Sequence, residues 1–179
     1  DKGIRTNLWM NPYVSPEGSL YKKIKPYSGS HTVWNGIVPD FTLDKPKKLF
    51  RKHFTRYHLN LGVSGYKIDE VDGYDFWLWP DHATFPSGTP AETMRQIYGM
   101  LVQRMLQKDL FQAHDQRTYS LVRATNGASA SYPFALYSDS YAHTQYVTGL
   151  SSASLAGLLW CPEIRSARSE REWINRMHT

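Results

Sequence analysis

The chain has 179 residues, and its 21 basic against 16 acidic residues give a formal charge of +5. One domain is the default expectation at this length. An apolar fraction of 41% is enough to build a core and excludes wholesale disorder. No apolar run approaches the roughly 20 residues of a membrane-spanning helix, so we expect no membrane contact. Aromatic residues are the outlier, because Trp, Tyr and Phe make up 14% of the chain.

The basic residues are densest in the segment 45–56. They lie opposite an apolar stripe that includes Leu49, Phe50 and Phe54, as on any solvated amphipathic helix. No zinc-finger, RNP-like or helix-turn-helix motif accompanies them. We therefore expect no nucleic-acid partner, and strongly salt-dependent binding would be the sign of one.

The single cysteine, Cys161, excludes an internal disulfide. It follows Trp160 in an apolar run, which indicates a packed core residue rather than a nucleophile. The first residues are Asp1-Lys2-Gly3, neither an initiator Met nor a signal peptide. We expect the chain to be part of a longer one, and its compartment, secreted and periplasmic locations included, stays open.

Strand and helix patterns alternate along the chain. Residues 3–9 predict a strand that ends at a loop rich in Pro, Ser, Gly and Tyr, and the amphipathic stretch 46–58 predicts a helix. Residues 62–69 predict a second strand, and a loop of Asp, Gly, Trp and Pro residues then runs to Gly88. This alternation is typical of a parallel sheet.

The next helix has the strongest pattern in the sequence. Thr89 is its expected cap, Pro90 its first residue, and Glu92 completes a capping box. Its apolar positions have the spacing of one buried stripe, and they are Met94, Ile97, Tyr98, Leu101, Val102, Met105 and Leu106. We interpret this stripe as core rather than as a cofactor site.

The C-terminal third continues the alternation. Its expected elements are a strand at 118–123, a short strand at 132–137, a helix at 143–155 and a strand at 157–161. Ser169 and Glu172 form a second capping box that opens a final helix. We expect Trp173, Ile174 and Met177 of that helix to face inward.

This order of elements predicts an α/β fold built from parallel βα units. In a (β/α)8 barrel the loops after the strands build the active site, and a complete barrel has about 250 residues. Because about five strands are expected, we predict that residues 1–179 form one incomplete TIM-barrel domain of about five central βα units. Open sheet edges would leave such a part neither well folded nor active alone.

Polar and aromatic residues stand at the predicted strand ends. They are Trp9 and Asn11, then Asp69, Glu70 and Asp72, then Arg123, then Asp139, then Glu163 and Arg165. Two carboxylates on a rim lined with aromatic rings indicate glycoside hydrolysis, because flat rings and charged groups suit sugar faces and hydroxyls. Asp69 and Asp139 are the candidate pair. The alternative is that Asp69 caps a loop and Asp139 lies in a polar turn.

The sequence motifs for other kinds of site are weaker. The segment 69–73 resembles a calcium loop, but its Gly falls one place early for an EF-hand and no Glu occupies the twelfth position. The sequence has no His-Glu-x-x-His, no Gly-rich phosphate loop after a strand and no Gly-x-Ser-x-Gly elbow. We therefore expect no metal and no cofactor.

Several segments resemble glycoside hydrolase family 31. Residues 65–70, Gly-Tyr-Lys-Ile-Asp-Glu, are similar to the family's nucleophile strand, and 38–42, Val-Pro-Asp-Phe-Thr, to the segment ahead of it. The stretch 123–139 resembles one that carries a substrate-binding Arg and ends at the acid/base Asp, and 149–157 resembles the helix and strand that follow. Trp34 stands just upstream, as in that family.

The resemblance implies a retaining α-glycosidase on a (β/α)8 barrel, with Asp69 as nucleophile and Asp139 as general acid/base. An oligosaccharide or glycoside is the expected partner, and the oligomeric state is open. The expected substrate-binding residues are Trp9, Asn11, Trp34, Glu70, Asp72, Arg123 and Glu163. Lys67 shares strand parity with Asp69 and belongs either beside it or in a structural ion pair. Trp77 and Trp79 are candidates for an outer subsite.

The chain departs from the α-glucosidase pattern of that family at three places. Asn11 stands where an Asp is usual, Leu136-Tyr137-Ser138 replaces the Trp-x-Gly before the acid/base Asp, and Glu163 follows the next strand in place of an Asp. The segments 69–73 and 161–166 look more like an α-galactosidase-type branch. An α-galactoside is the leading substrate. The alternatives are an α-glucosidase, an α-xylosidase, an α-N-acetylgalactosaminidase or a catalytically inactive carbohydrate-binding barrel.

Overall fold

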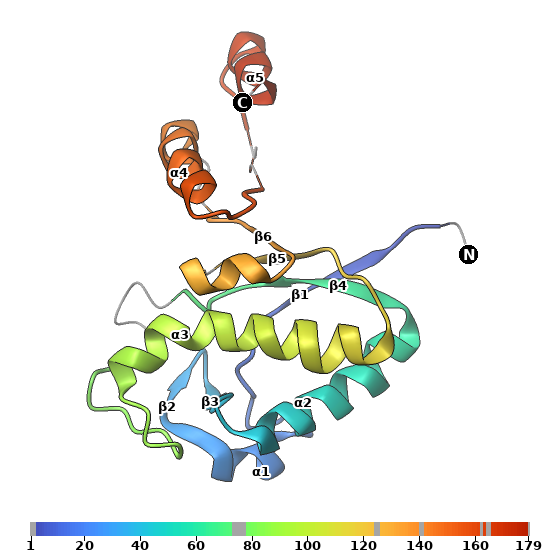
Figure 1. The fold of residues 1–179 in the computed structure, drawn as a ribbon, viewed down its shortest axis with the longest axis vertical. Coiled ribbons are helices and arrows are strands. Elements are labelled where there is room, and N and C mark those ends of the chain that lie inside the picture. Colours follow the sequence, from blue (N-terminus) through green and yellow to red (C-terminus); the bar gives the residue numbers. More distant parts are fainter. Residues whose placement is uncertain are drawn as a thin grey trace.

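The computed structural model describes residues 3–72, 78–123, 126–139, 142–161, 163 and 166–178. Within them, one parallel sheet has the strand order β1-β4-β5-β6, as Figure 1 shows. Its strands are β1 (Thr6–Met10), β4 (Val63–Ile68), β5 (Ser120–Val122) and β6 (Phe134–Leu136). A separate antiparallel hairpin joins β2 (Ser28–Val33) to β3 (Gly36–Pro39). The parallel α/β arrangement that the sequence predicts is confirmed.

The helices connect these strands. They are α1 (Tyr21–Ile24), α2 (Asp44–Tyr57), α3 (Ala91–Arg104), which continues as a π-helix (Met105–Phe111), α4 (His143–Leu155) and α5 (Glu170–Met177). Short 3-10 turns lie at Lys25–Tyr27, Leu59–Leu61, Gln112–His114 and Gly127–Ser131. Figure 1 shows α2 and α3 on the same side of the sheet and α4 and α5 extending away from it. No helix of the described part has both the length and the apolar content to cross a membrane.

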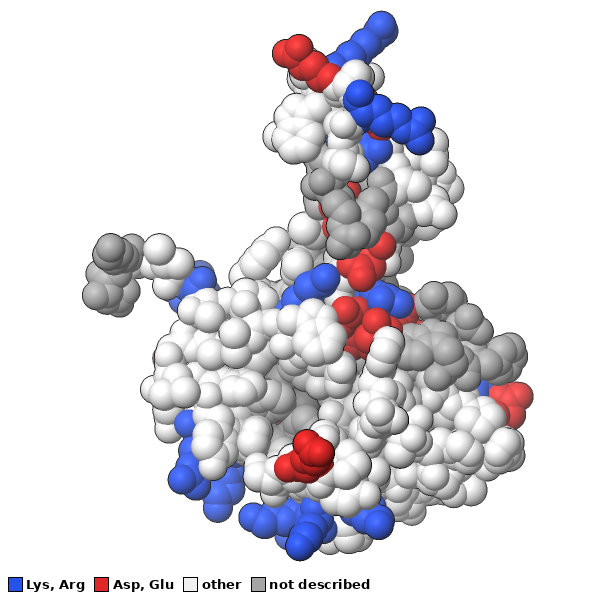
Figure 2. All heavy atoms as spheres, turned by 180° about the vertical axis from the view of Figure 1, so that it is seen from behind, with Lys and Arg blue, Asp and Glu red and all other residues white. Residues whose placement is uncertain are grey.

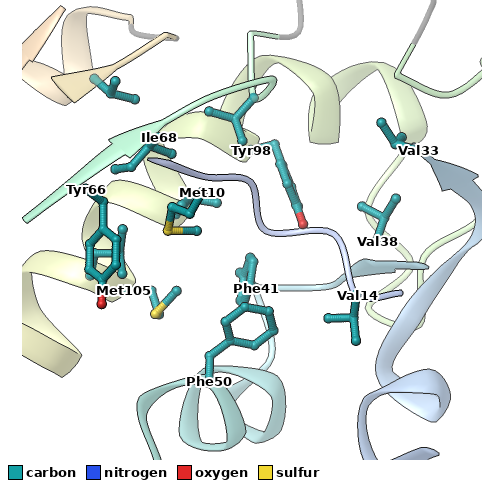
Figure 3. Close-up of a cluster of buried hydrophobic side chains, with 14 of the residues drawn as sticks. Met10, Val14, Val33, Val38, Phe41, Phe50, Tyr66, Ile68, Tyr98 and Met105 are labelled. Carbon is teal, nitrogen blue, oxygen red and sulfur yellow. The ribbon is translucent and has the colours of Figure 1, made fainter. Parts of the chain in front are cut away.

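An aromatic core fills the space between the sheet and the helices α2 and α3 (Figure 3). Tyr66 and Ile68 of β4 are fully buried and point into this layer, where the ring of Tyr66 contacts Phe54 of α2 edge-on. Because neighbouring side chains of a strand point to opposite faces, Lys67 and the residue after the strand, Asp69, face the other side. The packing of one face of β4 thus sets which residues reach the opposite face.

The stripe predicted for the central helix is confirmed as core. Met94, Tyr98 and Val102 have no exposed surface, and the buried stripe continues into the π-helix. The predicted cap is wrong. Pro90 occupies the N-cap position with extended backbone and no side-chain cap, since the hydroxyl of Thr89 contacts that of Ser87 instead (2.8 Å).

Two expectations for the C-terminal third are corrected. The predicted fifth strand is reduced to a single parallel bridge between Leu136 and Trp160. In α5, Ser169 caps Glu172 as expected, but Trp173, Ile174 and Met177 are exposed rather than inward. The amphipathic pattern identifies the apolar face of a helix, and the described residues provide no layer that covers this one.

One glycine sets the spacing between β4 and β5. A Cβ atom on Gly65 would lie 2.1 Å from the backbone oxygen of Tyr119, closer than real Cβ contacts allow. The side-chain amide of Asn7 in β1 donates to the same oxygen (2.7 Å). Gly65 therefore lets three chain segments meet just before the strand end where the candidate carboxylates follow.

Candidate active site

Asp69 directly follows β4 and is held by its neighbours. Its backbone N–H donates to the carbonyl oxygen of Met10 (2.9 Å), which continues the ladder with β1 past the strand end. The indole N–H of Trp9 donates to Asp69 Oδ2 (2.8 Å), and the Glu70 N–H donates to Oδ1 (2.9 Å). With 5% of its surface exposed, Asp69 is a buried carboxylate with both oxygens bonded.

Arg123 links the carboxylates that follow β4. Its backbone N–H extends the β4–β5 ladder by donating to Ile68 (2.9 Å). Its Nη1 lies 3.3 Å from Asp69 Oδ1 and 3.2 Å from Glu70 Oε1, and its Nε lies 3.2 Å from Asp72 Oδ2. One guanidinium therefore partly neutralises a cluster of three carboxylates. Burying any of these carboxylates without a positively charged partner would be costly in free energy.

The contacts of the same guanidinium also set an upper limit on the distance between the carboxylates of Asp69 and Asp139, the two catalytic candidates. Its Nη1 lies 3.3 Å from Asp69 Oδ1 and 3.8 Å from Asp139 Oδ2, so these two oxygens are at most 7.1 Å apart, the sum of the two distances. The two carboxyl groups of a glycosidase are about 5–5.5 Å apart in retaining enzymes and about 6.5–9.5 Å in inverting ones. Asp69 and Asp139 thus meet at one edge of the sheet within reach of one glycosidic bond.

Asp139 lies in a turn after β6 with a left-handed backbone (φ 57°). Lys67 reaches it from β4, with Nζ 3.4 Å from Asp139 Oδ1 and 4.5 Å from the centre of the Tyr137 ring. Glu163 Oε2 accepts hydrogen bonds from the backbone N–H groups of Ser138 (3.0 Å) and Asp139 (2.8 Å). Of the two alternatives for Lys67, the structure shows an ion pair, and the partner of Lys67 in it is Asp139.

The electrostatics of Asp69 favour its ionised form. Burial opposes ionisation, but hydrogen bonds from Trp9 and the Glu70 backbone, the adjacent Tyr137 hydroxyl and the positive charge of Arg123 outweigh it. They hold the pKa of Asp69 below its ordinary value. An ionised carboxylate is the form that a nucleophile at this position requires.

The pKa values of the two carboxylates beside Asp69 shift in the opposite direction. Burial raises the pKa of Glu70 and of Asp72, and the charge of Arg123 compensates only in part while the neighbouring carboxylates repel. Oδ1 of Asp72 is buried without a hydrogen-bond partner among the described residues. These charges therefore surround Asp69 at a cost to stability that the fold has to offset.

Two tyrosines that the sequence analysis did not single out belong to the site. The hydroxyl of Tyr137 donates to the carbonyl oxygen of Ile68 (3.2 Å), and burial and the adjacent Asp69 raise its pKa. The hydroxyl of Tyr13 donates to the carbonyl oxygen of Glu70, and burial raises its pKa as well. Tyr137 shares strand parity with Asp139, a signal that could have identified it.

Other expected site residues have different surroundings. The side-chain oxygen of Asn11 accepts from the Tyr13 N–H (3.1 Å), a local turn contact. Trp34 opens the two-residue turn between β2 and β3 and is 68% exposed. Trp79 is buried, with its indole N–H on the carbonyl oxygen of Ala91 (3.0 Å), so it cannot form an outer subsite. Trp77 and Arg165 lie outside the described residues.

Of the nine candidate residues, those that share contacts in one cluster are Trp9, Asp69, Glu70, Asp72, Arg123, Asp139 and Glu163. Figure 2 shows acidic and basic side chains gathered where the upper helices leave the main body. Within the described ranges no three His, Cys, Asp or Glu side chains are arranged to hold a metal ion.

A comparison with protein families decides the wider classification. The pattern described as "Glycosyl hydrolases family 31 TIM-barrel domain" matches residues 1–176. The chain belongs to glycoside hydrolase family 31. The parallel sheet of this family 31 chain, with helices between its strands, is the corresponding part of a TIM barrel.

Individual relatives are more distant. An α-xylosidase of Emericella nidulans is 24% identical over 182 residues, covering 92% of this chain and 23% of the xylosidase. A family 31 sulfoquinovosidase from E. rectale, solved with an aza-sugar inhibitor, is 22% identical with a TM-score of 0.66, covering 77% of this chain and 22% of that one. The cycloalternan-degrading enzyme from Trueperella pyogenes is 15% identical with a TM-score of 0.70, covering 90% and 26%.

This family 31 chain spans about a quarter of the length of these relatives. The solved structures are similar to it in fold. Among the names that the relatives carry are a xylosidase and a sulfoquinovosidase, and the α-galactosidase-type branch that the sequence segments suggested finds no support in them.

Proposed function

We propose that the domain carries the catalytic pair of a retaining α-glycosidase. The observation that supports the proposal is the position of Arg123, which brings the carboxylates of Asp69 and Asp139 within 7.1 Å of each other. They follow β4 and β6, parallel strands on either side of β5, at the edge of a TIM barrel where active sites lie. Trp9 borders the pair with a half-exposed ring that can pack on a sugar face.

The proposed mechanism assigns each carboxylate one task. Asp69, kept ionised by its hydrogen bonds, attacks the anomeric carbon while Asp139 donates its proton to the glycosidic oxygen. A covalent glycosyl–enzyme intermediate forms and the aglycone leaves as an alcohol. Asp139 then takes a proton from water, which attacks the same carbon and releases the sugar with its anomeric configuration retained.

The charge of the cluster restricts the class of sugar that can bind there. Among the described residues, five carboxylates face two cations there, and they are Asp69, Glu70, Asp72, Asp139 and Glu163 against Lys67 and Arg123. An anionic sugar would meet repulsion at this surplus of negative charge. We therefore propose a neutral terminal sugar, with α-xyloside and α-glucoside ahead of α-galactoside because the curated relative carries the name α-xylosidase.

A panel of aryl α-glycosides tests the proposal in the full-length protein. It contains the α-xyloside, α-glucoside, α-galactoside and N-acetyl-α-galactosaminide, with an α-sulfoquinovoside as the anionic sugar. We expect Asp69→Asn to lower kcat by at least about 10⁴-fold and Asp139→Ala by about 10²–10⁴-fold. Asp115→Asn, which removes a carboxylate from a distant left-handed turn, is the matched control and should retain full activity.

The stereochemical course separates the remaining alternatives. Proton NMR of the first product should show the α-anomer, and a β-anomer would contradict a retaining mechanism. Sugar binding without turnover of any glycoside would instead support the carbohydrate-binding barrel. Preferential hydrolysis of the α-sulfoquinovoside would contradict the charge argument while leaving the catalytic pair intact.

A further inference from the structure

The turn that carries Asp139 has an unfavourable backbone conformation. Asp139 has a φ of 57°, in the left-handed region that costs a non-glycine residue free energy. Such a residue persists only when its surroundings hold it in place. Contacts from outside the turn are therefore needed to hold Asp139 in this conformation.

Glu163 supplies such contacts from a different segment of the chain. A single oxygen, Oε2, accepts hydrogen bonds from the N–H groups of Ser138 (3.0 Å) and Asp139 (2.8 Å) and from the Ser138 hydroxyl (3.3 Å). Two successive backbone N–H groups that converge on one anion form a concave anion-binding turn. Hydrogen bonds from N–H groups to a carboxylate are stronger than those to a neutral acceptor.

The segment that carries Glu163 is itself fixed to the sheet. The N–H of Leu136 donates to the carbonyl oxygen of Leu159 (2.7 Å), and the N–H of Cys161 donates to the carbonyl oxygen of Leu136 (2.7 Å). This bridge aligns residues 159–161 with β6 and brings Glu163 under the turn. The anchor is thus supported by backbone pairing on the strand that leads to Asp139.

We propose that Glu163 is a positioning residue for Asp139 rather than a ligand for the sugar. Glu163 fixes the backbone of the turn, while Lys67 (3.4 Å) and Arg123 (3.8 Å) contact the Asp139 side chain. Loss of the anchor lets the turn relax out of the left-handed conformation and moves the carboxyl group away from the glycosidic oxygen. The inference rests on the proposed function, because it assumes that Asp139 is the acid/base.

Two substrates with the same sugar and different leaving groups test this role. A phenyl glycoside needs protonation of its leaving oxygen, whereas a 2,4-dinitrophenyl glycoside leaves without it. A displacement of about 1 Å can cost about 10²-fold in rate. For Glu163→Ala we therefore expect kcat/KM to fall about 10- to 100-fold on the phenyl glycoside and less than about 3-fold on the dinitrophenyl glycoside. On the dinitrophenyl glycoside, azide should raise the kcat of this variant and yield the α-glycosyl azide, because it attacks the glycosyl–enzyme intermediate without needing a general base.

The conservative variant and a matched control complete the experiment. Glu163→Gln keeps a neutral oxygen at the turn, should fold where the alanine variant does not, and should show the same selective loss to a smaller degree. Glu172→Ala is the control, because this carboxylate also accepts a backbone N–H, that of Arg168 (2.7 Å), away from the site. We expect it to change neither substrate's kcat/KM.

The outcomes separate the inference from the proposed function. Equal losses on both substrates, or a rise in KM with unchanged kcat on both, would show that Glu163 binds the sugar or only stabilises the fold, and would overturn the inference. A wild-type protein that hydrolyses no glycoside would overturn the proposed function, and the inference with it. An active wild type with unchanged leaving-group dependence in both variants would overturn the inference alone.

Discussion

Two charged regions of the molecule differ in almost every respect. At the strand ends, Arg123 is enclosed by carboxylates, and its side chain is only 17% exposed. On α2, the basic residues Lys48, Arg51, Lys52 and Arg56 are exposed and line a shallow hollow of about 700 Å³. Figure 2 shows Lys and Arg side chains along the lower end of the molecule, where α1 and α2 lie.

The difference explains why the formal charge of +5 says little about function. Charges on the exposed face of α2 keep their water, so they cost little and interact weakly. Charges at the strand ends lose their water and must be matched by hydrogen bonds and opposite charge. The pairing of Arg123 with Asp69 is therefore informative about function, whereas the surplus on α2 indicates a solvated helix face.

The largest expected effect on stability comes from removing an arginine, and one arginine in each region can be compared. Arg123→Met leaves three carboxylates without their shared partner, so we expect the free energy of unfolding to fall by about 3 kcal/mol. Arg51→Met removes an exposed charge and should change it by less than about 0.5 kcal/mol. Urea unfolding of both variants of the full-length protein measures the difference, and equal effects would show that the cluster at the strand ends is as solvated as α2.

Changing the pH tests the same cluster without altering Arg123. Burial raises the pKa of Glu70 and Asp72 in the folded protein, so the folded state binds more protons than the unfolded state just above the ordinary carboxyl range. Stability from these two groups should therefore rise as the pH falls from about 7 towards their unfolded values. Asp69, whose pKa is lowered, acts oppositely, and its contribution is lost only at lower pH, as the pH falls through its folded value.

The double variant Glu70→Gln with Asp72→Asn isolates this effect. Relative to the wild type, its unfolding midpoint in urea should depend less on pH between about 5 and 7. Glu17→Gln, at an exposed position, is the control and should keep the wild-type slope. A double variant with an unchanged slope would contradict the burial of these carboxylates.

The sequence was sufficient where periodicity and strand order determine the structure. The strand predicted at residues 62–69 placed Lys67 and Asp69 on one face by parity, and the structure buries Tyr66 and Ile68 on the other. Because the ends of parallel strands meet at one edge, the sequence also predicted that Asp69 and Arg123 share a site, and they are 3.3 Å apart. These predictions depend on local geometry, which neighbouring residues set.

Other features depend on partners that a sequence does not show. In the β2–β3 hairpin, β2 is mostly polar and β3 has only four residues, all buried, so neither shows the alternation that predicts a strand. The apolar face of α5 was recognised, but its direction depends on what covers it. The position of Glu163 at a strand end was predicted, whereas its target, the backbone of the Asp139 turn, follows only from the bridge at Trp160.

The smallest expected effect comes from changing the basic region itself. On α2, Lys52 lies one turn from both Lys48 and Arg56, two like-charge pairs that each cost a few tenths of a kcal/mol. Lys52→Glu converts both into opposite-charge pairs, so it should raise the free energy of unfolding by about 0.5–1 kcal/mol at low salt. The gain should nearly vanish in 1 M NaCl, where the screening length is about 3 Å. Lys52→Gln, which only removes the charge, should gain about half as much, and a salt-independent gain in either variant would mean that packing rather than charge controls this face.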